Sequence, residues 1–153
     1  VYGPNEYFKG SMASMIFHGY KQIKEIGKVK LFKSCNPQYA DGGQLRDFVY
    51  VKDICDVMYW MLQHPQVNGL FNLGTGRAQS FAELAEATFH ALGMEPNIEY
   101  IDMPEHLKKK YQYYTKAEMG QLRSSGCNKE FKNLEEGVRD YVLGYLDKKF
   151  EIY

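Results

Sequence analysis

The spacing of apolar residues along the chain changes repeatedly between helical and strand periodicity. A helical spacing joins Met12, Met15, Ile16, Gly19 and Ile23. We expect Ser11 to cap this helix and Gly27 to end it. Short apolar runs predict strands at 29–32, 48–51, 70–73 and 98–101.

Four further helices are predicted from their start signals. Asp53 is expected to cap a helix that stops at His64, before a proline. A serine, threonine or asparagine followed three residues later by glutamate is typical of a capping box. This pair occurs at 80–83, 115–118 and 133–136. Strands and helices therefore alternate, without internal repeats, and the predicted fold class is α/β.

Composition and charge narrow the range of functions. The chain has 153 residues, enough for one domain or one lobe of a larger protein. Its 19 basic and 19 acidic residues balance, which argues against nucleic acid or a membrane surface as a charge-driven partner. The three cysteines match no disulfide or zinc pattern and favour a reducing cytoplasm, and the four histidines lack metal-ligand spacing. The chain opens at Val1 without a methionine, so we expect it to be part of a longer protein.

Gly74-Thr75-Gly76 lies between a predicted strand and a predicted helix, as a dinucleotide-binding loop would. The third glycine of that motif is missing, and no acidic residue follows at the expected distance. A tight turn is the better interpretation of these three residues.

The segment around Lys9 and Ser11 is the first candidate for chemistry, because loops at a sheet edge commonly carry ligand sites. Lys9 precedes a predicted helix start, where backbone N–H groups favour anions. His18 lies seven residues after Ser11, two helical turns along the same face. For Lys9 alone, a solvated loop lysine is the better interpretation, whereas for His18 a surface or half-buried histidine explains the spacing equally well.

Two further positions carry positive charge near aromatic rings or a strand. Arg46 precedes the predicted strand 48–51, where it could clamp a diphosphate or form an ion pair with Asp47. Three lysines at 108–110 precede Tyr111, and either a nucleotide diphosphate or a solvated loop would explain them.

Taken together, these motifs resemble the sugar-nucleotide epimerases and dehydratases of the extended short-chain dehydrogenase/reductase family. The shared motifs are Val1-Tyr2-Gly3-Pro4, Arg46-Asp47-Phe48-Val49-Tyr50-Val51 with Asp53, and Asn72-Leu73-Gly74-Thr75-Gly76. The resemblance covers residues 1–153. It implies a substrate-binding lobe plus the last strand and helix elements, near 48–64 and 70–93, of a Rossmann-type NAD(P)-binding domain. The dinucleotide-binding half would then precede Val1.

Within the family, residues 9–14 and 110–112 resemble the epimerases that invert the sixth carbon of an ADP-activated heptose for lipopolysaccharide inner-core synthesis. That resemblance implies an isomerase with tightly bound NADP, working as a cytoplasmic homo-oligomer. Lys9 would be one proton acceptor, opposite a tyrosine outside this chain, and both Val1 and Lys9 would approach NADP. The remaining matched residues would bind substrate: Ser11 and His18 the sugar or its phosphate, and Phe32, Lys33, Ser34, Cys35, Arg46 and Tyr111 the nucleotide and diphosphate.

Two alternatives remain open from the sequence. One is another family member, such as a nucleotide-sugar 4-epimerase or dehydratase, which would not need Lys9. The other is a non-catalytic module that binds nucleotide sugars or acts in assembly, with a merely structural loop at 2–14. We also expect that the 153-residue chain cannot epimerise its substrate alone.

Overall fold

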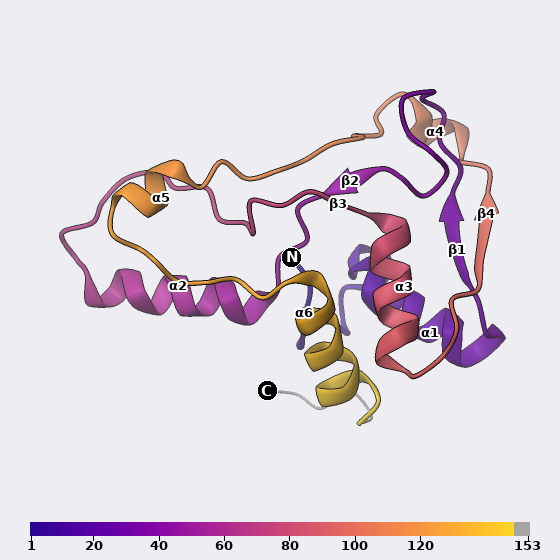
Figure 1. The fold of residues 1–153 in the computed structure, drawn as a ribbon, viewed down its shortest axis with the longest axis horizontal. Coiled ribbons are helices and arrows are strands. Elements are labelled where there is room, and N and C mark those ends of the chain that lie inside the picture. Colours follow the sequence, from indigo (N-terminus) through magenta and orange to yellow (C-terminus); the bar gives the residue numbers. More distant parts are fainter. Residues whose placement is uncertain (149–153) are drawn as a thin grey trace.

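The computed structural model describes residues 1–148 and confirms the α/β fold class (Figure 1). In chain order its elements are η1 (Gly10–Met12), α1 (Met15–Ile26), β1 (Val29–Phe32), β2 (Leu45–Arg46), α2 (Val51–Gln63), β3 (Gln79–Ser80), α3 (Phe81–Ala91), β4 (Ile98–Ile101), α4 (Glu105–Lys108), α5 (Gly120–Ser124), α6 (Leu134–Tyr141) and η2 (Val142–Leu146). η1 is a 3₁₀ turn and η2 a π-helical turn.

Two short sheets organise the described part of the chain. β1 pairs in parallel with β4, with Val29 opposite Ile98, and β2 pairs antiparallel with β3, with Arg46 opposite Gln79. Helices α1 and α3 lie beside the β1–β4 pair, whereas α2 and α5 lie at the opposite end of the molecule (Figure 1). The strands 29–32 and 98–101 predicted from the sequence are confirmed.

Helix α1 begins later than predicted, because Ser14 and not Ser11 caps it. The Ser14 hydroxyl accepts a hydrogen bond from the Phe17 backbone N–H at 3.3 Å. The buried Glu6 carboxylate accepts from the Ser14 N–H at 2.7 Å and from its hydroxyl at 2.6 Å, which fixes this serine as the cap. Gly27 ends the helix as predicted, in a left-handed conformation with φ of 67°.

The predicted strands 48–51 and 70–73 are wrong for the described part of the chain. Near the first, only an isolated parallel bridge joins Tyr2 to Tyr50, and α2 begins at Val51. The second forms no ladder within residues 1–148 and leaves Leu70 88% exposed. A strand needs a partner for its backbone N–H and C=O groups, and the apolar pattern alone does not provide one.

Two of the three predicted capping boxes are confirmed, Ser80 with Glu83 at α3 and Asn133 with Glu136 at α6. The box at 115–118 is wrong, because α5 begins only at Gly120. Asp53 does not cap α2 either. Its buried carboxylate lies within the first turn of that helix and accepts from the Lys132 N–H at 2.9 Å and Nζ at 3.2 Å.

The main core joins the N-terminal segment to α1, α3 and α6, and Tyr2 lies within it. The Tyr2 ring packs against Tyr50 and Tyr141, with ring centroids 5.3 and 6.4 Å apart. Gly137 on α6 makes this close approach possible. A Cβ atom at Gly137 would lie 2.1 Å from the Tyr2 hydroxyl oxygen.

We expect Gly137→Ala to lower the free energy of unfolding by about 1–3 kcal/mol, because the added methyl group overpacks the Tyr2 contact. Alanine is otherwise the better helix former, so a fall in stability would isolate the packing effect. Urea denaturation measures the change. Gly120→Ala on α5 is the matched control, since no atom lies within 4 Å of a Cβ at that position. Equal stabilities for the two variants would contradict the prediction.

Candidate functional site

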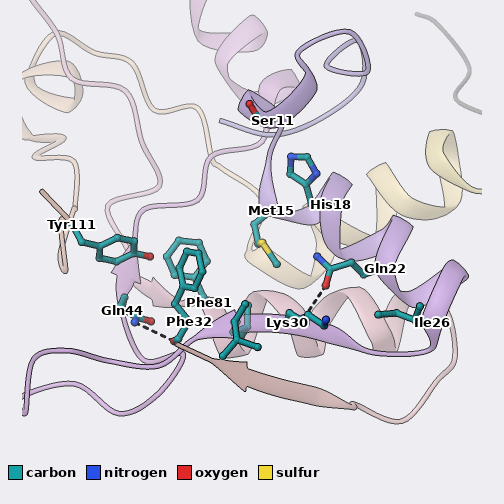
Figure 2. Close-up of a pocket in the computed structure, with 12 residues that line it drawn as sticks. Ser11, Met15, His18, Gln22, Ile26, Lys30, Phe32, Gln44, Phe81 and Tyr111 are labelled. Atoms are coloured by element: carbon teal, nitrogen blue, oxygen red, sulfur yellow. Dashed lines mark hydrogen bonds between the residues drawn. The ribbon is translucent and has the colours of Figure 1, made fainter. Parts of the chain in front are cut away.

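The candidate site is a cavity of about 500 Å³ that lies along α1, β1 and the start of α3 (Figure 2). Helical spacing places several of its α1 residues on one face of that helix. The cavity is lined by Ser11, Met15, His18, Gln22, Ile26, Lys30, Leu31, Phe32, Gln44, Phe81, Ile101 and Tyr111. Its volume falls in the range that small-molecule ligands occupy.

One end of the cavity is polar. Ser11 belongs to the η1 turn and His18 to the second turn of α1, and both line the same wall (Figure 2). His18 is half-buried and its ring makes an edge contact with Phe17, at 5.7 Å between centroids. The structure therefore brings together two residues that the sequence proposed for a shared pocket.

The other end of the cavity is aromatic. Phe32, Phe81 and Tyr111 gather there, and the rings of Phe32 and Tyr111 meet edge to face at 6.5 Å (Figure 2). Burial raises the pKa of the Tyr111 hydroxyl and outweighs the opposing charge of Arg46. The phenol is therefore protonated at neutral pH and can donate a hydrogen bond. Flat π faces and one donor suit a heteroaromatic ligand.

Arg46 places a positive charge beside the aromatic end. Its Nη1 donates to the Leu45 carbonyl at 2.8 Å, and its Nη2 donates to the Gln112 carbonyl. The guanidinium lies 5.8 Å from the Phe81 ring centroid and 5.6 Å from that of Tyr111. The ion pair with Asp47 that the sequence left open is absent among residues 1–148, so the charge of Arg46 is free to meet an anion.

Asp47 instead ties three segments of the chain together. Its carboxylate accepts hydrogen bonds from the Thr75 N–H at 2.8 Å, the Thr75 hydroxyl at 2.6 Å, and the Gly76 and Ala117 N–H groups at 3.0 Å each. The predicted tight turn at 74–76 is present, with Gly76 at φ of 70°. Because these amide groups already donate to Asp47, they are not available to hold a phosphate.

Residues 33–35 follow β1 as a loop and lie outside the wall of the main cavity. Lys33 Nζ forms an ion pair with Asp102 at 3.0 Å, and the Ser34 N–H donates to Asp41 at 2.7 Å. The Cys35 N–H donates to the Tyr113 hydroxyl at 3.0 Å, which joins this loop to the aromatic segment. Of the predicted nucleotide segment, only Phe32 lines the cavity itself.

Val1 and Lys9 also lie apart from the main cavity. Lys9 is exposed at the start of η1. Val1 lines a second cavity of about 200 Å³, together with Arg46. Met15 and Phe81 line both cavities and form the wall between them.

Sequence reasoning missed Gln44 and Phe81. Gln44 lies in none of the predicted helices or strands, and Phe81 is only the first residue after the predicted cap Ser80. One signal was present: in extended backbone, residues 44 and 46 lie on the same side, so Gln44 accompanies Arg46. The antiparallel pairing of β2 with β3 then brings Phe81 beside both.

Residues 1–148 contain no cluster of metal-ligating side chains and no long apolar helix. No group of three or more His, Cys, Asp or Glu side chains there could hold a metal ion. In the same residues, no helix has the length and apolar character needed to cross a membrane.

The fold and these motifs define a class of proteins. Residues 1–74 match the model of the NAD dependent epimerase/dehydratase family. The predicted resemblance to epimerases and dehydratases is confirmed for these residues.

The chain is also similar in sequence to individual members of this class. The chain is 58% identical over 146 residues to the ADP-L-glycero-D-manno-heptose-6-epimerase of Nitratidesulfovibrio vulgaris Hildenborough, a match that covers 95% of this chain and 45% of the relative. It is 52% identical over 155 residues to the enzyme of the same name from Fusobacterium nucleatum, covering 97% of this chain and 47% of that relative.

A crystal structure with the same name, from Helicobacter pylori, superposes on this chain with a TM-score of 0.76 at 28% identity. The match covers 94% of this chain and 41% of that one. The chain therefore spans less than half the length of the curated relatives and of the solved structure that it matches.

Proposed function

We propose that this chain is the substrate-binding part of an NADP-dependent ADP-glycero-manno-heptose 6-epimerase, an isomerase of lipopolysaccharide inner-core synthesis. The observation that carries the proposal is the single cavity of about 500 Å³ that joins Ser11 and His18 to Phe32 and Tyr111. These residues come from separate segments of the chain. The sequence resemblance implies that these residues bind the sugar and the nucleotide.

In this proposal the substrate lies along the cavity. The adenosine diphosphate occupies the aromatic end, where Arg46 neutralises phosphate charge and Tyr111 donates a hydrogen bond. The heptose reaches the polar end, where Ser11 and His18 can bind its hydroxyl groups. Lys33, Ser34 and Cys35 border the nucleotide from the loop after β1.

The cofactor would approach from the side of Val1. NADP, when bound, would accept a hydride from the sixth carbon of the heptose and return it to the opposite face. The cavity at Val1, about 200 Å³, is smaller than the pockets that hold whole ligands, so this chain offers the cofactor an edge of contact. The amide groups of Thr75 and Gly76 are already bound to Asp47, so that turn does not fit a dinucleotide phosphate.

Lys9 would move the proton on one face of the sugar. Inversion requires a proton acceptor on each side of the reacting carbon, and a tyrosine outside this chain would be the second. Lys9 immediately precedes η1, which contains Ser11, so a sugar bound by Ser11 would lie close to Lys9.

The apolar surface of α2 supports the proposed domain organisation, in which 48–64 and 70–93 pack on a Rossmann-type sheet. Met58, Tyr59 and Leu62 are 57%, 61% and 80% exposed, and Leu70 is 88% exposed. Several exposed large apolar side chains on one helix are typical of a site of contact. The protein would act in the cytoplasm as a homo-oligomer. The 153-residue chain alone would be inactive, which measurable NADP-dependent turnover by that chain would disprove.

Calorimetry on the full-length protein tests the proposed substrate class. We expect ADP-heptose to bind more tightly than ADP-glucose, and ADP-glucose more tightly than UDP-glucose. Equal binding of the two glucose nucleotides would favour a different nucleotide-sugar enzyme. Binding of none of the three would leave only a role in assembly.

Arg46→Ala is expected to weaken ADP binding by about 10–100-fold, because charge-assisted hydrogen bonds to the diphosphate are lost. Arg46→Lys should recover only part of this affinity, since an ammonium lacks the planar fork of a guanidinium. Titration calorimetry measures both. Arg139→Ala, on the exposed face of α6, is the control and should bind ADP normally. Equal ADP affinities of the Arg46→Ala and Arg139→Ala variants would contradict the role of Arg46.

A further inference from the structure

We propose that Gln44 determines which nucleobase the cavity accepts, by presenting its side-chain amide to the edge of an adenine ring. The inference rests on the proposed function, because it takes the ligand to be a nucleotide. It adds a residue to the site that neither the motifs nor the sequence resemblance marked.

The burial and bonding of Gln44 carry the first step. The residue is only 1% exposed, yet it lines the cavity of about 500 Å³. Its Nε2 makes one long hydrogen bond, 3.4 Å, to the Phe32 carbonyl, and that carbonyl already accepts from the Gly42 N–H at 3.2 Å. Within residues 1–148, no hydrogen bond reaches its Oε1. Because Gln44 lines the cavity, this unused acceptor can take a hydrogen bond from a ligand bound there.

The surroundings of the amide indicate a base and not a sugar. Figure 2 shows Gln44 at the end of the cavity that holds Phe32, Phe81 and Tyr111, whereas Ser11 and His18 lie toward the other end. Aromatic rings stack on a flat heterocycle, and a nucleobase is the flat part of a nucleotide sugar. Arg46 flanks the same rings, and a nucleotide whose base lay there would carry its diphosphate, through the ribose, close by.

The backbone on both sides of Gln44 is fixed by hydrogen bonds. The Gln44 carbonyl accepts from the Phe81 N–H at 3.3 Å. The next residue, Leu45, donates to the Tyr113 carbonyl at 2.8 Å and accepts from the Thr115 N–H at 3.1 Å. The amide is therefore positioned in advance, and a residue that must discriminate between ligands needs such a fixed support.

The chemistry of the amide selects the purine. A glutamine offers an acceptor beside a donor, and adenine presents the complementary donor and acceptor at its N6 and N7 atoms. Inosine carries an oxygen in place of the N6 amino group, so the same edge would set two acceptors against the amide. The site should therefore distinguish ADP from inosine 5′-diphosphate.

The experiment compares the affinities of ADP and inosine 5′-diphosphate by calorimetry on the full-length protein. We expect ADP to bind at least about tenfold more tightly, and Gln44→Met to reduce that preference to less than about threefold. Methionine keeps the length of the side chain and removes both polar atoms. Gln44→Leu is a second variant in case the first does not fold. Gln38→Leu, on the exposed part of the same loop, should keep the full preference.

The possible outcomes separate the two proposals. If neither nucleotide binds to the unmodified protein, the proposed function fails. If ADP binds but is not preferred over inosine 5′-diphosphate, the role of Gln44 is overturned while the nucleotide site stands. The same holds if the preference survives in a folded Gln44→Met or Gln44→Leu protein. If Gln44 had only a structural role, its replacement would lower the affinities for ADP and inosine 5′-diphosphate equally and leave their ratio unchanged.

Discussion

Replacement of Lys9 by alanine is expected to lower epimerase turnover of the full-length protein by about 10²–10⁴-fold, the usual contribution of a proton-transfer group. The free energy of unfolding should stay within about 0.5 kcal/mol of its original value, because the Lys9 side chain is exposed. Nuclear magnetic resonance of the two heptose epimers measures the turnover, and urea denaturation measures the stability. A large loss of activity without a loss of stability would identify Lys9 as part of the chemistry.

Lys116→Ala provides the matched control, since Lys116 is an equally exposed lysine outside both cavities. It should retain full turnover. A Lys9→Ala enzyme with normal activity would contradict the proposal and would favour a 4-epimerase or dehydratase, whose chemistry does not use this lysine. Affinity for ADP should be similar in both variants, because the nucleotide end of the cavity does not include either residue.

Asp47→Ala is expected to lower the free energy of unfolding by at least about 3 kcal/mol. The carboxylate accepts from three backbone N–H groups and one hydroxyl, and a hydrogen bond to a charged group contributes about 1.5–3 kcal/mol. Asp47→Asn should recover part of this loss, because its amide keeps one acceptor oxygen. The affinity for ADP should fall as well, since Arg46 is the preceding residue.

Urea denaturation of Asp47→Ala beside Asp56→Ala makes this test specific. Asp56 is exposed on α2, so its removal should change the free energy of unfolding by less than about 0.5 kcal/mol. Similar stabilities for the two variants would show that the segments at 74–76 and 115–117 do not depend on Asp47.

Local signals predicted the elements that local forces build. Ser80 and Asn133 cap their helices through side chains three residues away, so the sequence was sufficient for α3 and α6. Prediction from the sequence failed where a carboxylate from another segment binds the residues at an expected helix start. Glu6 selects Ser14 over Ser11 as the cap of α1, and Asp47 draws the segment at 115–117 away from a helix start. Neither contact follows from spacing.

The residues of the candidate site also differ in whether the sequence could predict them. Ser11 and His18 are close in sequence and line the same wall, but Ser11 belongs to η1 and not to α1, so the helical spacing assumed for this pair was not its cause. Gln44 and Phe81 meet only because β2 pairs with β3. Each of these strands has two residues, which is too short a pattern to predict the pairing from the sequence. The segment at 70–73 has a strand pattern but lacks a partner within residues 1–148, so its pattern alone was misleading.

The carboxylate of Asp47 also affects the order in which the chain folds. It joins residues separated by 28 and 70 positions, so each of its contacts requires the closure of a long loop. Helix α1 needs only neighbouring residues and can form first. Arg46 and the aromatic rings around it reach their final places only after these loops close, so the speed of assembly of the nucleotide end is governed by distant contacts.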